Sequence, residues 1–287
     1  MTKILITGAN SYIGQSFSNW IEKNTKNVSI ATLEVKGDAW TKESLAGIDA
    51  IFHVAGIAHI KETRENAELY YQVNRDLTVQ LAEKAKREGV GQFVFLSSMS
   101  VYGKEAGKID DRTPLIPNSN YGKSKMQAEH FINQMADEHF HVTILRPPMI
   151  YGPGCKGNYP KLAQLALKTP IFPDTENRRS MLYIDNLCSY VWVLIRDKRS
   201  GLFLPQNSEY VNTGDLVQQI ALAHDKKMTL TKLFTPLIRI VKVSVVEKVF
   251  GSLYYEKDTE NRIDHTEISF ADSIKETEKS NEINVNK

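Results

Sequence analysis

The sequence predicts an α/β protein of the Rossmann type, in which a doubly wound parallel sheet carries helices on both faces and is joined by a small C-terminal region. Short β-rich runs alternate with helical stretches through the first half of the chain, a pattern typical of parallel strands linked by crossover helices. A glycine-containing turn directly follows the first of these runs. The fourth run is continuously apolar, which is typical of a strand buried on both faces.

Five strand units are expected in order. The strands are rich in Ile, Val, Leu and Phe and occupy 4–6, 28–33, 50–54, 93–96 and 142–145. The helices between them carry apolar residues at helical spacing and occupy 13–23, 66–88 and 124–138. Beyond this point we expect further elements, namely helices at 161–167 and 185–196 and a strand at 201–204.

These patterns divide the 287 residues into three parts. Residues 1–148 are expected to form the main domain, and the segment 184–206 to return to its sheet. Residues 149–270 are expected to form a smaller region, in which 212–248 is helical and partly apolar. From about residue 256 the chain is polar and loses periodicity, so 271–287 is expected to be a flexible polar tail.

The composition excludes several classes of protein. Lys and Arg number 36 and Asp and Glu 34, so a net charge of +2 argues against nucleic-acid binding through bulk charge. The two cysteines, Cys155 and Cys188, stand outside any CxxC or Cys/His cluster, which argues against a disulfide framework or a metal site. No targeting segment and no apolar run of about 20 residues is visible, so we expect a cytoplasmic protein without a membrane span.

One basic stretch leaves two interpretations open. Between Lys226 and Lys248, basic residues are interleaved with apolar ones at helical spacing. A solvated helix face is the ordinary interpretation, and a helix that docks on a membrane surface or a partner is the alternative.

The turn after the first strand has the features of a dinucleotide site. It has the sequence Thr7-Gly8-Ala9-Asn10-Ser11-Tyr12-Ile13-Gly14. Gly8 permits a tight turn, Gly14 lets the helix pack closely on the strand, and the helix N-terminus offers amides to a pyrophosphate. Ser11 stands where a glycine is usual, and its hydroxyl is able to donate to the phosphate. The alternative is a turn that needs glycine for backbone reasons alone.

An acidic residue follows the second strand. Glu34 lies 20 residues after Gly14, where a carboxylate accepts hydrogen bonds from the adenosine ribose and repels a 2′-phosphate. This favours NAD over NADP, although Lys36 softens the discrimination. An exposed glutamate at a strand end is the alternative interpretation.

A tyrosine and a lysine form the second candidate group. Tyr121 and Lys125 are four residues apart and share a helix face. An ammonium beside a phenol lowers the pKa of the phenol from about 10, which makes tyrosine a general acid/base near neutral pH. Ser98, at the end of the fourth strand, is placed to hydrogen-bond the same substrate oxygen. Taken alone, the Tyr-Lys pair is equally typical of a solvated helix face.

Together these segments resemble the extended short-chain dehydrogenase/reductases, the NAD-dependent epimerase/dehydratases that act on nucleotide sugars. The resemblance rests on residues 7–14, on Phe95-Leu96-Ser97-Ser98-Met99-Ser100-Val101-Tyr102-Gly103 and on Tyr121-Gly122-Lys123-Ser124-Lys125. It implies that Tyr121 is the catalytic acid/base, that Lys125 binds the nicotinamide ribose and tunes Tyr121, and that Ser98 is catalytic. Ser100 is implied to assist at the substrate.

The resemblance also implies a cofactor, NAD(H) or NADP(H), and a set of residues that bind it. These are Gly8, Asn10, Ser11, Tyr12, Ile13, Gly14, Glu34, His53, Ala55, Gly56, Asn74 and Lys125. It makes 149–270 a substrate-binding region, and it implies a UDP-sugar substrate and a homodimer.

Two later segments narrow the implied substrate. Arg179 matches an arginine that grips the nucleotide diphosphate. Met149 stands in a segment where epimerases and 4,6-dehydratases carry an asparagine, and Asn158 is implied to replace part of the lost contact. The segment is more similar to that of bacterial polysaccharide-cluster reductases. We therefore expect NAD(P)H-dependent reduction of the C4 keto group of a UDP-4-keto-6-deoxy-N-acetylhexosamine. A 4-epimerase with bound NAD and a non-catalytic nucleotide sensor are the alternatives.

Overall fold

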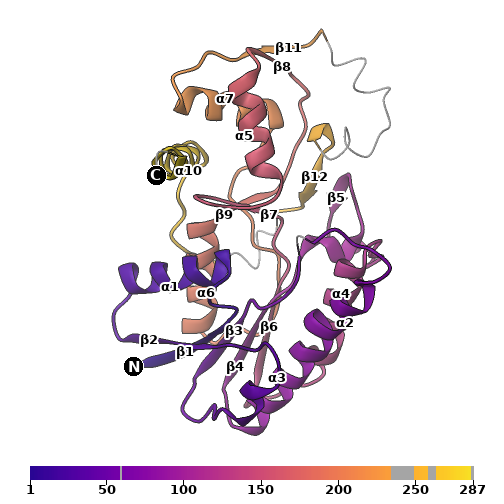
Figure 1. The fold of residues 1–287 in the computed structure, drawn as a ribbon, viewed down its shortest axis with the longest axis vertical. Coiled ribbons are helices and arrows are strands. Elements are labelled where there is room, and N and C mark those ends of the chain that lie inside the picture. Colours follow the sequence, from indigo (N-terminus) through magenta and orange to yellow (C-terminus); the bar gives the residue numbers. More distant parts are fainter. Residues whose placement is uncertain (59, 234–248, 258–262, 286–287) are drawn as a thin grey trace.

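The computed structural model describes residues 1–58, 60–233, 249–257 and 263–285 (Figure 1). Its centre is a six-stranded parallel sheet in the order β10-β6-β4-β3-β1-β2. The strands are β1 (Thr2–Thr7), β2 (Val28–Leu33), β3 (Ala50–His53), β4 (Gln92–Leu96), β6 (His141–Leu145) and β10 (Gly201–Phe203). The predicted fold class is confirmed, and 201–204 returns to the sheet as expected.

Helices cover both faces of this sheet (Figure 1). On one face lie α1 (Tyr12–Asn24) and α6 (Ile184–Arg196), which bury apolar residues such as Phe17 and Leu187. On the other lie α3 (Leu77–Arg87) and α4 (Asn120–Asn133), which bury residues such as Leu81 and Ile132. The helical periodicity of these segments therefore reflects burial against the sheet.

The strand order has its point of reversal at β1, next to the edge strand β2. Because β2 and β3 lie on opposite sides of β1, the chain reverses its direction across the sheet at β1. The loops after β1 and β3 diverge there, and in open α/β sheets ligands bind at this point, beyond the carboxyl ends of the strands.

The long helix expected at 66–88 is interrupted. It forms α2 (Ala67–Tyr71), a π-helical turn η2 (Gln72–Asp76) and then α3. Asn74 lies at the middle of the π turn and is fully buried. Such turns are rare and often occur at functional sites.

Helix α4 begins four residues before the predicted start. Ser119 is its N-cap, and its hydroxyl accepts a hydrogen bond from the amide of Gly122 at 3.1 Å. Serine is a favoured N-cap because it satisfies an amide that has no partner within the helix. Both Tyr121 and Lys125 therefore lie within the helix, as the four-residue spacing requires.

The C-terminal region consists of short elements beyond the sheet. Two-stranded sheets join β7 (Met149–Tyr151) to β9 (Met181–Tyr183), β8 (Ile171–Pro173) to β11 (Thr229–Thr231) and β5 (Gly107–Ile109) to β12 (Leu253–Tyr255). Two helices, α5 (Asn158–Lys168) and α7 (Thr213–Ala223), lie beside them. The helical stretch expected at 212–248 is thus α7 followed by β11, and 234–248 lies outside the described residues.

The expected polar tail at 271–287 is instead largely a helix, α10 (Phe270–Val285). Three tyrosines from the C-terminal region bond to it. Tyr159 donates to Glu278 Oε1 at 2.7 Å, Tyr183 donates to Glu276 Oε2 at 2.7 Å, and the hydroxyls of Tyr151 and Ser273 lie 2.6 Å apart. The prediction was wrong because this helix is held largely by hydrogen bonds to its polar side chains, and such a helix does not show an apolar stripe in the sequence.

Within the described residues, no helix is both long and apolar enough to cross a membrane.

Candidate active site

The glycine turn after β1 lies tight against the end of β3. Gly8 has φ +72°, and a Cβ added to it would lie 2.8 Å from the Cα of Ala55. A Cβ on Gly14 would lie 2.5 Å from the carbonyl oxygen of Gly8. Ser11 caps α1, since its hydroxyl accepts from the amide of Gly14 at 3.1 Å. Only glycine fits at these two positions, so the turn packs tightly between β1, the end of β3 and the N-terminus of α1.

Several predicted cofactor residues surround this turn. Asn10 is exposed at its tip, and Ile13 is half-buried in the first turn of α1. Glu34 is exposed directly after β2, where its carboxylate accepts a hydrogen bond from the amide of Lys36 at 3.0 Å. The side chain of Tyr12 points elsewhere. Its hydroxyl is buried against Gly152, without a hydrogen-bond partner in the described chain.

His53 is a core residue whose side chain is fully engaged within the protein, and its place in a segment that lines the cofactor stays a prediction. Its ring is fully buried, with Nδ1 2.6 Å from the hydroxyl of Thr7 and Nε2 2.9 Å from the hydroxyl of Thr78. Burial, with a smaller effect from the charge of Lys125, lowers the pKa of His53 to about 3. A neutral ring that joins β1, β3 and α3 has no atom left for a ligand.

Asn74 holds the loop after β3 against α4. Its side chain accepts from the amide of Ile57 at 2.9 Å and donates to the carbonyl of Ile57 at 3.0 Å. It also donates to the hydroxyl of Ser124 at 3.2 Å. A Cβ on Gly56 would lie 2.8 Å from Asn74 Oδ1 and 3.4 Å from Lys125 Nζ. Asn74, Gly56 and Lys125 are therefore in close contact, as the sequence predicts for one site.

The predicted catalytic hydroxyls also meet. Ser98 caps the short helix η3 (Met99–Tyr102), since its hydroxyl accepts from the amide of Ser100 at 3.1 Å, and it lies near the side chain of Tyr121. Ser100 lies within reach of the same serine, with their hydroxyl oxygens 3.1 Å apart. Burial raises the pKa of Tyr121, and the neighbouring Ser98 hydroxyl opposes that rise. The expected lowering of the tyrosine pKa is thus absent in this structure.

Lys125 is buried and points toward the sheet. Its Nζ donates to the carbonyl of Leu96 at 2.9 Å and lies 4.6 Å from the centre of the Phe95 ring. Burial lowers the pKa of Lys125 to about 8, and the negative charge of Glu129 acts in the opposite direction. The ammonium is bound to the strand rather than to the phenol of Tyr121.

The sequence interpretation missed an ion pair behind this lysine. Glu129, four residues after Lys125, is buried and bonds both to Arg146 and to the hydroxyl of Ser97. The signal was present in the spacing, because 121, 125 and 129 recur every four residues on one face of α4. A glutamate on the buried face of a helix requires a partner.

The predicted substrate residues lie in the C-terminal region. Arg179 donates from Nη1 to the carbonyl of Gly251 at 2.8 Å, and burial lowers the pKa of its guanidinium. Among the ion pairs of the described residues, none involves Arg179, so its charge is available to an anion. Asn158 is exposed as the first residue of α5, and its role stays a prediction.

A sequence-family model described as the NAD dependent epimerase/dehydratase family matches residues 4–204. This match spans the sheet, the glycine turn and the Ser98–Tyr121–Lys125 group. The chain belongs to this family.

Curated relatives agree with this membership in the epimerase/dehydratase family. A UDP-glucose 4-epimerase of Vibrio cholerae is 29% identical over 291 residues, covering 92% of this chain and 85% of the relative. An N-acetyl-alpha-D-glucosaminyl-diphospho-ditrans,octacis-undecaprenol 4-epimerase of Escherichia coli O157:H7 is 27% identical over 230 residues. That alignment covers 77% of this chain and 69% of the relative.

Solved structures share the fold of this epimerase/dehydratase chain. A UDP-glucuronic acid 4-epimerase from Bacillus cereus, in complex with NAD, gives a TM-score of 0.74 at 19% identity, covering 97% of this chain and 96% of that one. RMD from Pseudomonas aeruginosa, complexed with NADPH, gives 0.76 at 17% identity, covering 97% and 99%.

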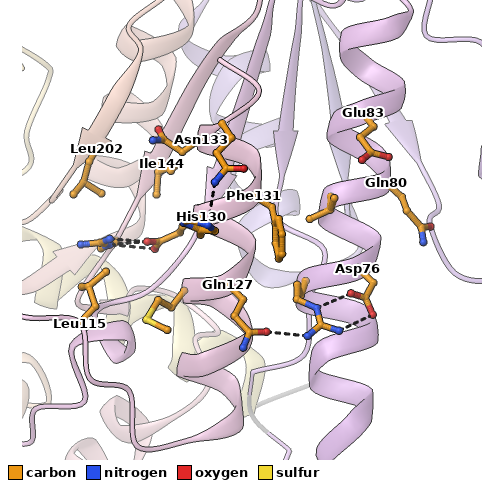
Figure 2. Close-up of a pocket in the computed structure, with 16 residues that line it drawn as sticks. Asp76, Gln80, Glu83, Leu115, Gln127, His130, Phe131, Asn133, Ile144 and Leu202 are labelled. Atoms are coloured by element: carbon orange, nitrogen blue, oxygen red, sulfur yellow. Dashed lines mark hydrogen bonds and ion pairs between the residues drawn. The ribbon is translucent and has the colours of Figure 1, made fainter. Parts of the chain in front are cut away.

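A cavity of about 1360 Å³ in this family member lies away from the site (Figure 2). It opens on the outer face of α3 and α4, where Arg75 donates to Gln127 at 2.9 Å and pairs with Asp76 at 2.6 Å. Phe131 projects there and is 45% exposed. Among the described residues, no group of three or more His, Cys, Asp or Glu is arranged to hold a metal ion.

Proposed function

We propose that the chain catalyses hydride transfer at C4 of a UDP-linked sugar. The observation that carries this proposal is the proximity of the Tyr121 and Ser98 side chains. They lie at the edge of the sheet where Lys125 and the loop of Gly56 come together. A phenol and a serine hydroxyl directed at one oxygen are what proton exchange at a carbonyl or alcohol requires.

The residues present fit a nicotinamide dinucleotide, NAD(H) or NADP(H). Gly8 and Gly14 let the turn pack against the backbone of Ala55 and the start of α1 pack against the turn itself, which is the close packing that a dinucleotide turn requires. The exposed carboxylate of Glu34 is suited to ribose hydroxyls. When bound, the cofactor supplies or accepts the hydride.

The chain's own residues handle the proton and the substrate. Tyr121 exchanges a proton with the C4 oxygen, and Ser98 orients that oxygen by a hydrogen bond. Lys125, one turn after Tyr121 on the same face of α4, supplies a positive charge that stabilises negative charge developing on the phenol during the reaction. Arg179, which has one hydrogen bond to a carbonyl, grips the diphosphate of the UDP group.

In the reductase version, a UDP-4-keto-6-deoxy-N-acetylhexosamine gains a hydride at C4 and a proton from Tyr121 at the C4 oxygen. The oxidised cofactor then leaves. Met149 supports this version, because it lies in the segment where epimerases of the family carry an asparagine.

In the epimerase version, NAD held at the glycine turn would stay bound and would accept and return the C4 hydride, while Tyr121 exchanges the proton of the C4 oxygen and the keto sugar turns its other face to the cofactor. The names of the relatives from Vibrio cholerae and Escherichia coli support this version. The same residues serve both versions, and what differs is whether the cofactor leaves and whether the sugar turns.

An assay separates the two. Purified protein is incubated with UDP-glucose, UDP-N-acetylglucosamine and a UDP-4-keto-6-deoxy-N-acetylhexosamine, and the absorbance of added NADH and NADPH is followed. Consumption of cofactor only with the keto sugar supports the reductase. Interconversion of 4-epimers without added cofactor excludes the reductase in favour of the epimerase. If neither cofactor consumption nor epimer interconversion is observed with any substrate, the C4 proposal is contradicted.

Replacing Tyr121 distinguishes an enzyme from a nucleotide sensor. Tyr121→Phe is expected to abolish turnover while binding of NADH, measured by fluorescence titration, is spared. Tyr190→Phe is the control, since Tyr190 lies on α6 on the opposite face of the sheet. Unchanged turnover in Tyr121→Phe would remove Tyr121 from the mechanism.

We also propose that two copies of the chain pair through the outer face of α3 and α4. Phe131 and Leu202 are 45% and 48% exposed around the cavity on this face, which supports an apolar contact there. Size-exclusion chromatography is expected to give a dimer for the wild type and a monomer for Phe131→Glu. Leu222→Glu, at an exposed position of α7, is expected to leave the dimer intact.

A further inference from the structure

A buried ion pair lies directly behind the predicted catalytic helix. Arg146, which follows β6, binds Glu129 of α4 with Nε 3.1 Å from both carboxylate oxygens and Nη2 2.6 Å from Oε2. Glu129 is 4% exposed and Arg146 8%. The hydroxyl of Ser97 donates to the same carboxylate.

Further groups surround the pair on every side. Arg146 Nη1 donates to the hydroxyl of Tyr102 at 2.9 Å, and its guanidinium lies over the Tyr102 ring at 5.1 Å. The hydroxyl of Tyr255, on β12, donates to the carbonyl of Arg146 at 2.7 Å. The ion pair is thus surrounded by residues that lie on α4, η3 and β12 or directly after β4 and β6.

Stability alone is a poor explanation for this arrangement. Removing two charges from water costs several kcal/mol per ion, and a well-packed apolar pair is often as stable or more stable. We therefore expect an effect of the buried ion pair on a neighbouring group, and Lys125 is that neighbour.

The geometry connects the pair to Lys125 by two routes. Tyr121, Lys125 and Glu129 follow one another at four-residue intervals on one face of α4. Along β4, Lys125 Nζ is bonded to the carbonyl of Leu96, and the next residue, Ser97, donates to Glu129. The ammonium is therefore bonded to the last residue of β4 and the carboxylate to the residue that follows it.

The effect of each neighbouring group on the pKa of Lys125 has a definite direction. Burial lowers the pKa of Lys125 to about 8, and the charge of Glu129 raises it. His53 faces Lys125 from β3, but its pKa of about 3 keeps it neutral at the pH of interest. Tyr102 and Tyr255 are also buried phenols with raised pKa values, so they carry no charge near neutral pH.

We propose that Glu129 is a positioning residue of this active site, whose carboxylate, paired with Arg146, keeps Lys125, one turn after Tyr121, in its ammonium form. This inference rests on the proposed function, in which that ammonium stabilises the phenolate. Glu129 acts through Lys125 and does not touch the substrate.

The test removes both charges of the pair together. In the double variant Glu129→Gln/Arg146→Met no charge is left without a partner, so the melting temperature is expected to stay near that of the wild type. The alkaline limb of the pH–rate profile is expected to move to lower pH, because the double variant loses the Glu129 charge that raises the pKa of Lys125. Glu138→Gln, at an exposed carboxylate beyond the end of α4, is the control and is expected to leave the profile unchanged.

A second measurement does not depend on turnover. The side-chain signal of Lys125 is followed by NMR across pH in protein labelled at lysine, with Lys125→Met to assign it. We expect Lys125 to lose its proton at lower pH in the double variant than in the wild type. If the double variant does not fold, Glu129→Gln alone is used, with the same expectation.

The outcomes are distinct. An unchanged titration of Lys125 in the variant overturns the inference, whatever the activity. A shifted titration in a protein that turns over none of the sugars supports the role of Glu129 and contradicts the proposed function. If the double variant is as stable as the wild type and the alkaline limb of its pH–rate profile does not move, the ion pair is only structural.

Discussion

Glu62 binds the helix that carries Tyr121, because its Oε1 accepts a hydrogen bond from the backbone amide of Tyr121 at 3.1 Å. Its other oxygen, Oε2, accepts from the amide of Asn120, also at 3.1 Å. A carboxylate at this place satisfies two amides that have no partner within α4 and complements the helix dipole. The loop after β3 thereby fixes the start of the helix whose first turn holds the predicted acid/base.

Replacing Glu62 with alanine is expected to lower kcat about fivefold, the effect of losing about 1 kcal/mol of capping energy. The KM for the nucleotide sugar is expected to change little, because Glu62 holds the helix rather than the substrate. Steady-state kinetics provide the check, with Glu43→Ala, an exposed carboxylate after η1 (Ala39–Lys42), as the control. A loss confined to KM would contradict this role.

Gly8 and Gly37 offer a matched pair of glycines with the same φ of +72°. A Cβ on Gly8 would meet the backbone of Ala55 at 2.8 Å, whereas a Cβ on Gly37 would meet nothing within 4 Å. Gly37→Ala is expected to cost about 1 kcal/mol from backbone strain alone. Gly8→Ala is expected to cost clearly more and to weaken NADH binding at least tenfold. Equal effects in urea unfolding and fluorescence titration would refute the steric argument.

His53 makes stability depend on pH in the acid range. Its folded pKa of about 3 lies below the unfolded value near 6.5, so below pH 6.5 the unfolded chain binds a proton that the folded chain refuses. Stability is expected to fall by up to about 1.4 kcal/mol per pH unit from this group as the pH drops from 6.5 toward 3. In His53→Gln this part of the slope is expected to vanish.

Urea unfolding at pH 7, 6 and 5 measures the slope. His139→Gln, at an exposed histidine, is the control and is expected to keep the wild-type slope. The same slope in His53→Gln and the wild type would show that the buried ring is not its source.

Lys125 is expected to destabilise the fold that it serves. Burial lowers its pKa to about 8, below the unfolded value near 10.4, so at pH 7 the folded state holds an ammonium at a cost of about 3 kcal/mol. Lys125→Met is therefore expected to unfold at higher urea than the wild type at pH 7. Since the unfolded lysine keeps its proton up to about pH 10, the wild type gains stability between pH 8 and 10 and the difference shrinks.

Melting curves at pH 7 and pH 10 test this, with Lys123→Met, at an exposed position of the same helix, as the control. A variant with no advantage at pH 7, or with one that does not change with pH, would be inconsistent with a desolvated ammonium at this position.

The sheet could be predicted from the sequence because its central strands are runs of apolar residues buried on both faces, as in Phe93–Phe95, which are fully buried. The glycine turn was predictable for a similar reason, since Gly8 and Gly14 have a local backbone requirement. The two-stranded sheets could not be predicted because strands of three residues are too short to show the alternation of apolar and polar residues. Helix α10 escaped because its buried positions include Ser273 and Thr277, which resemble surface residues until their partners are known.

The site was predictable only where its residues lie close in sequence. Tyr121 and Lys125 share one helix, so their spacing indicated a common face. The partner of Glu129 is Arg146, 17 residues away on another element, and the partners of His53 are Thr7 and Thr78. Nothing local in the sequence separates a histidine in contact with a cofactor from one enclosed by two threonines.

Because of the π turn at Gln72–Asp76, the contacts with α4 depend on the number of residues between Tyr71 and Arg75. The hydroxyl of Tyr71 reaches Asn120, Asn74 reaches Ser124, and Arg75 reaches Gln127, so both sides of the turn face α4. Deleting one residue would give a regular helix, but it would rotate one half by about 100° relative to the other. One set of contacts to α4 would then be lost, so at this point the chain tolerates a change of side chain better than a change of length.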